Sequence, residues 1–160
     1  TIQWSPEDCD MIEVRLATFS DSKDIFEWRN DSHTRQMLHN SKLVKWNEHE
    51  SWFEETLGNC NRCLLICVDK KDEKVGVVRF DISDNSAELS INLSPQKHGK
   101  GLAKLCLNAA IQYFKSYFPK HKKLKAEIKK INRASQKSFE GIGFEFEKEV
   151  DGVRHYTLIL

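Results

Sequence analysis

Apolar and polar residues alternate along several short segments of this chain, and each alternation predicts a half-buried β-strand. The predicted strands occupy residues 11–16, 64–68, 75–80, 87–93, 124–128, 144–150 and 154–160. Apolar residues at helical spacing predict helices instead. The first follows capping residues 20–22, the second begins near residue 47, the third runs from 102 to about 118, and the fourth covers 132–140. The polar stretch that ends at Asn40 predicts a connecting segment between the first two helices.

The order of these elements is strand, two helices, three strands, helix, strand, helix and two strands. Turn residues at 69–73 and 84–86 join the three consecutive strands into an antiparallel meander, and Asp151-Gly152 closes a last hairpin. At 160 residues with 39% hydrophobic content, the chain is long enough for one compact domain. Residues 11–160 form the predicted domain, and residues 1–10 are interpreted as a polar lead-in, a linker from an upstream domain.

Formal charge is nearly balanced at +1, so neither nucleic acid nor an anionic membrane is predicted as a partner. Several lysines gather between residues 120 and 130, where they are interpreted as a solvated loop and strand edge. No apolar run approaches the roughly 20 residues of a membrane helix, and the N-terminus lacks a secretory signal pattern. The protein is therefore expected to be soluble and cytoplasmic.

The five cysteines are odd in number, which predicts reduced thiols rather than a disulfide framework. Cys60-x-x-Cys63 lacks the second ligand pair that a structural zinc requires, so no metal site is predicted. Cys63 and Cys67 flank an apolar run and are interpreted as small buried residues of a strand.

The segment 93–103 is polar and contains two glycines between a predicted strand and the long helix. Gly99 and Gly101 lack the Cβ atoms that would keep a phosphate from the backbone, and they tolerate conformations that aim N–H groups inward. The following helix directs unpaired N–H groups and its positive dipole end at the same point. Further donors are available from Gln96, Lys97 and Lys100. The segment favours a pyrophosphate ligand, although an ordinary strand-to-helix turn also uses glycine.

Gln96-x-x-Gly99-x-Gly101 resembles motif A of the GNAT superfamily of acetyl-CoA-dependent N-acetyltransferases, in which this turn and helix hold the pyrophosphate of coenzyme A. Residues 132–135 (Asn-Arg-Ala-Ser) and 138–144 (Ser-Phe-Glu-Gly-Ile-Gly-Phe) resemble motif B of the same superfamily. The element order is similar to the GNAT fold over essentially the whole chain. The resemblance implies a single α/β (α+β) domain: a mixed, mostly antiparallel sheet of about seven strands, splayed at its middle strands, with about four flanking helices.

The resemblance also implies acetyl-CoA as co-substrate. Backbone N–H groups where the sheet splays would bind pantetheine and the thioester carbonyl oxygen as preorganised donors. The cofactor-binding residues implied at the splay and in the two motifs are Ile91, Asn92, Leu93, Gln96, Lys97, His98, Gly99, Lys100, Gly101, Leu102, Ala103, Asn132, Ser135, Ser138 and Phe139.

Acetyl transfer to an amine requires a base for the amine and a proton for the departing thiolate. Glu127, on the strand beside the splay, is the preferred candidate for the base, and Glu88, on the strand before motif A, is the alternative. Many GNAT enzymes place a tyrosine acid where this chain has Phe139. The thiolate is therefore expected to leave unaided, to take a proton from water, or to use Ser135 or Ser138.

For the acceptor, residues 28–31, 35–37, 49–53 and 77–81 resemble the acetyltransferases of pseudaminic acid biosynthesis (PseH-like). Those enzymes acetylate the 4-amino group of a UDP-linked amino-dideoxy sugar used in surface-polysaccharide or flagellin-glycan biosynthesis. Arginine pairs with a diphosphate, and aromatic and methionine side chains flank a base or sugar. The substrate-binding candidates carried over are Arg29, Met37, His49, Trp52 and Arg79.

Two alternatives stay open. Ribosomal-protein N-terminal acetyltransferases of the RimJ/RimL type share the features around residues 28–30 and 49–53, and would accept a basic peptide. A catalytically silent acyl-CoA-binding module is the second alternative, and Phe139 favours it. A homodimer and a fusion behind a sugar-nucleotide hydrolase are further expectations about partners.

Overall fold

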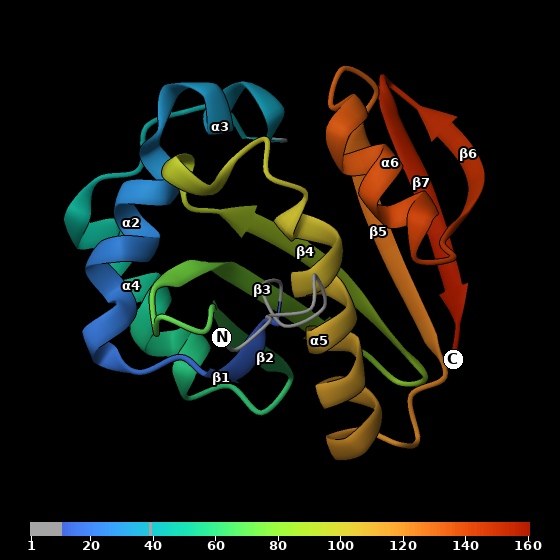
Figure 1. Cartoon of the computed structure of the whole chain (residues 1–160), viewed down its shortest axis with the longest axis horizontal. Helices are drawn as coiled ribbons and strands as arrows, with labels where there is room; N and C mark the ends of the chain where they lie inside the picture. Colours follow the sequence, from blue (N-terminus) through green and yellow to red (C-terminus); the bar gives the residue numbers. More distant parts are fainter. Residues whose placement is uncertain (1–10, 39) are drawn as a thin grey trace, which may run out of the picture.

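Seven strands form one sheet in the order β1-β2-β3-β4-β5-β7-β6 in the computed structural model, which describes residues 11–38 and 40–160 (Figure 1). Among the described strands, β4 and β5 pair in parallel and every other neighbouring pair is antiparallel. The strands are β1 (Glu13–Leu16), β2 (Arg62–Val68), β3 (Lys74–Ile82), β4 (Ser86–Leu93), β5 (Lys123–Lys129), β6 (Glu145–Val150) and β7 (Val153–Ile159). The predicted mixed sheet of seven strands is confirmed.

Helices cover both faces of this sheet. Five α-helices and two short 3-10 turns are described, where the sequence predicts about four helices. They are η1 (Phe19–Asp21), α2 (Ser22–Asn30), α3 (Ser32–Met37), α4 (Trp46–Leu57), η2 (Pro95–Lys97), α5 (Leu102–Tyr117) and α6 (Arg133–Gly141). The helix that the sequence does not predict is α3, which lacks an apolar face. It begins because the Asp31 carboxylate accepts hydrogen bonds from the Thr34 backbone N–H and hydroxyl, at 3.0 and 3.1 Å.

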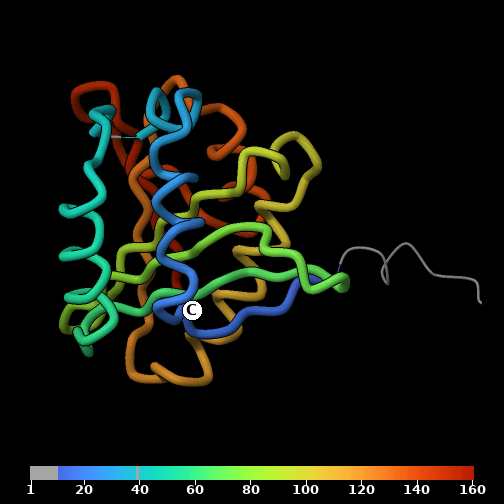
Figure 2. The backbone as a smooth tube through the Cα atoms, turned by 90° about the vertical axis from the view of Figure 1, so that its left-hand side faces the viewer, coloured from blue at the N-terminus to red at the C-terminus, as the bar shows by residue number. Residues whose placement is uncertain are grey.

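Two hydrophobic clusters form, one on each face of the sheet. Alternate strand residues such as Phe80 and Leu124 pack beneath α5 and α6, where Phe114 stacks on Phe80 with ring centroids 4.6 Å apart. The intervening residues, such as Val77, pack against α2 and α4 together with Trp28. Figure 2 shows α4 and α5 on opposite sides of the strands. Because strand side chains alternate between faces, the polar positions of β4 and β5 lie on the face opposite α5 and α6.

The described cysteines agree with the interpretation of buried thiols. Cys63, Cys67 and Cys106 are buried and Cys60 is exposed, and none of these four forms a disulfide. Burial raises the pKa of the Cys63 thiol to about 11, so this side chain is a neutral, apolar component of the core. Cys9 and the predicted lead-in fall outside the described residues. Within those residues, no helix has the length and apolar character needed to cross a membrane.

Candidate active site

The sheet opens between β4 and β5. These strands pair only from Ser86 to Glu88, opposite Lys123 to Lys125. Beyond that point β4 stays paired with β3 to Leu93, and β5 stays paired with β7 to Lys129. The two strands diverge from the lower right of Figure 1 toward its top. The edges at residues 89–93 and 126–129 therefore face each other without cross-strand hydrogen bonds, which makes backbone donors and acceptors available to an amide-containing ligand.

The end of β4 leads into the glycine turn and then α5. Gly99 and Gly101 both have φ of +72°, a left-handed conformation that other residues adopt at a cost. A Cβ atom on either glycine would meet nothing within 4 Å, so the space beside each glycine is open. No side chain caps the first turn of α5, whose N-cap residue is Gly101. The predicted anion site stays a prediction, and an uncapped helix start beside two turned glycines suits it.

Two of the predicted phosphate ligands have partners inside the protein. The Lys97 ammonium lies 2.6 Å from Glu73 and 3.5 Å from Asp69, and Gln96 accepts a hydrogen bond of 2.7 Å from Ser94. Lys97 therefore connects the motif A turn to the β2–β3 hairpin, and a direct phosphate contact would have to replace that ion pair. The sequence could not show this contact because Lys97 and Glu73 are 24 positions apart.

The remaining residues predicted to bind acetyl-CoA near this turn lie in the turn itself, at the start of α5 and at the end of β4. Lys100 is exposed, and Leu102 and Ala103 open α5 beside it. The His98 ring lies with its Nε2 atom 3.3 Å from the Leu93 carbonyl oxygen, at the end of the splayed strand. Ile91, Asn92 and Leu93 occupy the part of β4 that has no β5 partner. Their predicted role in binding acetyl-CoA stays a prediction that this arrangement allows.

Motif B forms α6 and the turn after it. Asn132 caps α6 by accepting a hydrogen bond from the Ser135 N–H at 3.2 Å, and the Ser138 hydroxyl donates to the Ala134 carbonyl at 3.0 Å. The Phe139 ring is 2% exposed and packs edge-on against Phe144. Phe139 is thus a core residue in this structure, and its side chain does not reach an open surface where a ligand could contact it.

Tyr156 is a polar group near motif B that the sequence reasoning missed. Its hydroxyl donates to the Glu140 carboxylate at 2.8 Å, and the ring is 1% exposed beneath α6. Burial and the hydrogen bond to Glu140 raise the pKa of Tyr156 to about 12. The other two tyrosines of the chain, Tyr113 and Tyr117, lie in the C-terminal half of α5. Phe139 itself offers no hydroxyl, so the absence of a tyrosine acid at this position stays a prediction.

Both base candidates lie on the face of the sheet opposite α5 and α6. Glu88 belongs to the last paired row of β4 and β5, where its partner is Lys125. Glu127 lies two residues beyond Lys125, on the divergent part of β5. The Glu127 carboxylate lies 3.5 Å from Nδ1 of His155, its cross-strand neighbour on β7. Glu127 therefore stands where the strands separate, which supports its choice over Glu88.

The predicted acceptor residues separate into two groups. His49 is 3% exposed and its Nε2 atom lies 2.8 Å from the Ser22 carbonyl oxygen, so it joins α4 to α2. Burial lowers the pKa of His49, which keeps it neutral. These contacts give His49 a structural role and leave it no open surface for substrate. Trp52 and Arg79 are half-buried and contact each other, with the guanidinium carbon 5.8 Å from the ring centroid.

Arg29 is an acceptor-binding candidate with a guanidinium nitrogen that lacks a hydrogen-bond partner among the described residues. One guanidinium nitrogen donates to the Asn40 carbonyl at 2.8 Å, while the other terminal nitrogen is buried with no partner among the described residues. Arg35 donates nearby to the carbonyls of Asn30 and Ser41, each at 3.3 Å. Burial, followed by repulsion from Arg35, lowers the pKa of Arg29. Neither arginine pairs with a carboxylate within the described chain, so this corner favours an anion. Met37, half-buried, ends α3 beside it.

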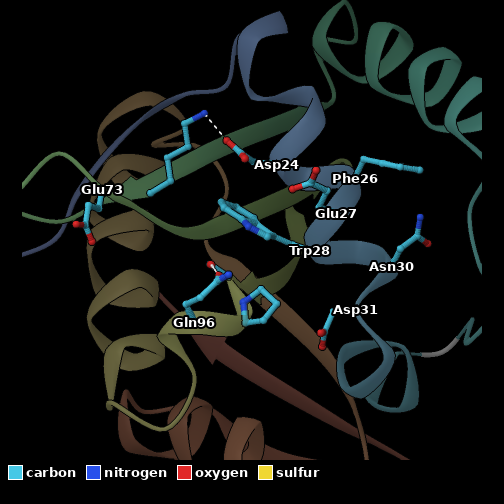
Figure 3. Close-up of a pocket in the computed structure, with 11 residues that line it drawn as sticks. Asp24, Phe26, Glu27, Trp28, Asn30, Asp31, Glu73 and Gln96 are labelled. Atoms are coloured by element: carbon cyan, nitrogen blue, oxygen red, sulfur yellow. Dashed lines mark hydrogen bonds and ion pairs between the residues drawn. The ribbon is translucent and has the colours of Figure 1, made fainter.

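A cleft of about 610 Å³ lies between α2, the start of β3 and η2 (Figure 3). Four carboxylates line it, and all four have partners, including Glu27, which lies 3.9 Å from the Lys23 ammonium. Asp24 pairs with Lys74 at 2.8 Å, Asp31 caps α3, and Glu73 pairs with Lys97. In Figure 3, Trp28 lies between Asp24 and Gln96, and Phe26 projects from the other side of α2. The cleft has an acidic rim, but most of its charge is neutralised internally.

The sheet divided at β4 and β5, with an uncapped glycine turn at the end of β4, fits the expected acetyltransferase arrangement. A family model described as "Acetyltransferase (GNAT) domain" matches residues 12–145. The chain belongs to the GNAT acetyltransferase family. The enzyme is therefore an N-acetyltransferase that uses acetyl-CoA, as the two motifs predict.

Solved structures agree with this GNAT fold. A domain from Methanocaldococcus jannaschii is 25% identical, with a TM-score of 0.82 over 93% of this chain and 98% of that chain. A spermidine N-acetyltransferase from Vibrio cholerae, in complex with CoA and spermine, is 18% identical, with a TM-score of 0.84 over 93% and 95%. A putative phosphinothricin N-acetyltransferase is 22% identical, with a TM-score of 0.76 over 93% and 98%. Among curated protein sequences, none matches the chain significantly.

Acetyl-CoA fits the residues present in this acetyltransferase. The open space around Gly99 and Gly101, together with the uncapped start of α5, suits a pyrophosphate, and the divergent edges suit an amide-containing arm. When bound, acetyl-CoA supplies an acetyl thioester to the enzyme. Across residues 11–38 and 40–160, no group of three or more histidine, cysteine, aspartate or glutamate side chains is arranged to hold a metal ion.

We expect Gly101→Ala to raise the KM for acetyl-CoA. The left-handed backbone at this position costs an alanine about 1–2 kcal/mol, so the turn would relax and misdirect its N–H groups, giving a roughly tenfold increase. Steady-state kinetics and calorimetric titration with coenzyme A measure this change. The matched control is Gly58→Ala, because Gly58 has a negative φ and its added methyl would meet only ordinary contacts. An unchanged KM for Gly101→Ala would contradict the prediction that this turn binds the pyrophosphate of coenzyme A.

Proposed function

We propose that this acetyltransferase transfers the acetyl group to the 4-amino group of a UDP-linked amino-dideoxy sugar, by direct transfer in a ternary complex. The observation that supports this acceptor is the Arg29 guanidinium beside Arg35, one nitrogen of which is buried with no partner among the described residues. Within residues 11–38 and 40–160, these two adjacent arginines donate to backbone carbonyls and to no carboxylate, which leaves donors for an anionic group. A sugar nucleotide supplies such an anion in its diphosphate.

The anion corner and the proposed base lie on the same side of the sheet. The Lys129 ammonium donates to the Gln36 carbonyl of α3 at 3.2 Å, so α3 covers the face from which Lys129 and Glu127 project. Arg35 belongs to that same short helix. An acceptor whose phosphates are held at Arg29 and Arg35 would therefore reach toward the divergence of β4 and β5 with its amine, while acetyl-CoA enters from the side of α5.

In the proposed reaction, Glu127 accepts a proton from the substrate ammonium. The freed amine attacks the thioester carbonyl carbon, a C–N bond forms, and the C–S bond breaks with its electron pair on sulfur. Backbone N–H groups at residues 91–93 would stabilise the negative charge on the carbonyl oxygen. The nitrogen loses its second proton through water to the thiolate, because Phe139 offers none. Because the reference pKa of a thiol is about 8.5, the thiolate is an adequate leaving group near neutral pH without a dedicated acid.

A polyamine acceptor, as named for the Vibrio cholerae structure, receives less support from this chain. A polycation needs carboxylates that are free to bind it. In the acidic cleft, Asp24 and Glu73 are paired with lysines, and Asp31 caps α3. Binding a polyamine there would require breaking these contacts, whereas an anion at Arg29 would approach a guanidinium with one nitrogen that has no partner in the described part of the chain.

The experiment measures thiol release from acetyl-CoA with three acceptors: a UDP-4-amino-4,6-dideoxy sugar, spermidine and a basic N-terminal peptide. We expect release with the sugar nucleotide. Arg29→Gln should raise the KM for it by about 10-fold to 100-fold, the loss of a charge-assisted contact of roughly 1.5–3 kcal/mol. Lys23→Gln, which also replaces a cation by glutamine but at an exposed position of α2, is the control.

Release with the peptide alone would assign protein N-terminal acetylation instead. Coenzyme A binding without release on any amine would identify a silent module. The predicted homodimer is checked on the same sample by light scattering, and the predicted upstream fusion lies outside the described residues.

A further inference from the structure

Lys97 is ion-paired and largely buried, although the resemblance to motif A predicts it as a phosphate ligand. Its ammonium donates a 2.6 Å hydrogen bond to Oε2 of Glu73 and lies 3.5 Å from Oδ2 of Asp69. The Lys97 side chain is only 18% exposed. We propose that Lys97 is a positioning residue for acetyl-CoA: it stays paired with Glu73 and Asp69 when the co-substrate binds, and this pairing fixes the glycine turn whose backbone N–H groups hold the pyrophosphate.

The turn between β2 and β3 is built around one of these carboxylates. Oδ1 of Asp69 accepts hydrogen bonds from the N–H groups of Lys71 and Glu73, at 2.9 and 3.0 Å, while Oδ2 is the oxygen closer to Lys97. The Asp69 N–H donates to the Glu73 carbonyl at 3.0 Å, which closes the turn. Burial alone would raise the pKa of Asp69, but the hydrogen bonds from Glu73 and Lys71 and the charge of Lys97 outweigh it and lower that pKa. The turn therefore presents an ionised, fixed carboxylate to Lys97.

Backbone contacts hold the segment before Lys97 against β3. The Ser94 N–H donates to the Val75 carbonyl at 2.8 Å, and the Lys97 N–H donates to the Ser94 carbonyl at 2.9 Å. Ser94 is 6% exposed, so this junction lies inside the protein. The glycines at 99 and 101 follow directly, and glycine has more backbone freedom than other residues. The side-chain link from Lys97 to the β2–β3 turn therefore restricts where the glycine turn begins.

The alternative is that Lys97 leaves its carboxylates and contacts a phosphate directly. That movement would leave two neighbouring carboxylates, Asp69 and Glu73, without the cation between them, which offsets the gain at the phosphate. Lys100 has no such cost, because it is exposed and forms no ion pair within the described part of the chain. In this scheme Lys100, and not Lys97, supplies the cation at the pyrophosphate.

Glu73→Gln separates the two roles of Lys97 because they predict opposite changes. If Lys97 were a phosphate ligand, loss of the Glu73 charge would free its ammonium, and coenzyme A would bind more tightly. If Lys97 positions the turn, Glu73→Gln and Lys97→Gln should each raise the Kd for coenzyme A about 3-fold to 10-fold. Calorimetric titration with coenzyme A measures this Kd. Glu149→Gln, the same change at an ion-paired glutamate of β6, is the control and should stay within about twofold of the parent protein.

A double variant tests whether Lys97 and Glu73 act as a pair. Because either single change already breaks the link, Lys97→Gln/Glu73→Gln should bind coenzyme A as weakly as Lys97→Gln alone. Salt provides a second comparison, since a direct attraction between a lysine and a phosphate is screened by added salt. Lys100→Gln should reduce the salt dependence of the Kd, whereas Lys97→Gln should leave it unchanged.

Backbone hydrogen exchange of residues 99–103, without coenzyme A, measures the positioning of the turn itself. We expect faster exchange in Glu73→Gln and Lys97→Gln than in the parent protein and Glu149→Gln. Urea unfolding of each variant ensures that Kd values are compared between folded proteins. None of these measurements uses an acceptor amine, so their outcome is independent of the sugar proposal. Tighter binding by Glu73→Gln, an unchanged Kd in both single variants, additive losses in the double variant, or a reduced salt dependence in Lys97→Gln would overturn the inference.

Discussion

Glu127→Gln is expected to lower kcat by about 10²–10⁴, the usual contribution of a positioned general base, while the KM for acetyl-CoA stays the same. The amide has nearly the shape of the carboxylate, so the β5–β7 pairing around it should persist, but it cannot accept the ammonium proton. Initial rates of thiol release, measured with the acceptor identified above, give both constants. Raising the pH should partly restore the variant, because more of the acceptor is then already neutral.

The matched control is Glu88→Gln. Glu88 presents the same group on the same face, but it belongs to the row where β4 and β5 are still paired. We expect less than about a threefold loss of kcat for this variant, as for a substitution outside the proton path. A large loss in Glu88→Gln together with a small one in Glu127→Gln would exchange the two assignments. Small losses in both would mean that a water molecule or a substrate group takes the proton.

The sequence predicts most of this fold because its elements have strong local patterns. α5 has an apolar stripe and a proline two positions beyond its end, and the structure places it at Leu102–Tyr117, within a residue of the prediction. The predicted hairpin at Asp151-Gly152 is also confirmed, with both residues at positive φ. α3 is missed because its start depends on one capping carboxylate, that of Asp31, and not on hydrophobic periodicity.

The site is less predictable because partners far apart in sequence determine what a side chain can do. Motif A predicts Lys97 as a phosphate ligand, yet its ammonium forms an ion pair with a carboxylate of the β2–β3 turn. A similar distance separates His49 from Ser22, whose carbonyl oxygen makes the imidazole structural. For Arg29 the informative fact is a buried nitrogen without a partner among the residues that the structure describes, which only three-dimensional packing can reveal. Local motifs therefore identify the reaction class, and long-range contacts decide which of the candidate residues remain available for it.

A buried charge network holds α2, the helix that carries Arg29, onto the sheet. The Asp21 carboxylate is fully buried and accepts hydrogen bonds from Arg15 of β1 at 2.8 and 2.9 Å, and from the Thr18 N–H at 2.8 Å. Lys74, the first residue of β3, lies 2.7 Å from the same carboxylate. Burial alone would raise the pKa of Asp21, but the hydrogen bonds from Arg15, Lys74 and Thr18 outweigh it and hold that pKa far below its usual range.

Asp21→Asn should therefore lower the free energy of unfolding at pH 7 by about 3 kcal/mol, since two cations lose the carboxylate that they surround. The pH dependence has a definite sign. A carboxyl whose pKa is depressed by folding contributes its full stability above its unfolded pKa of about 3.9, and that stability is lost as pH falls toward the folded value. The advantage of the parent protein over Asp21→Asn should thus be smaller by about 1 kcal/mol at pH 3 than at pH 7. Urea unfolding at the two pH values measures this.

Asp24→Asn, which removes a 42% exposed partner of Lys74, is the control and should lower the free energy of unfolding by at most about 1 kcal/mol. An advantage of the same size at both pH values would show that Asp21 stabilises the protein by its shape and not by its charge.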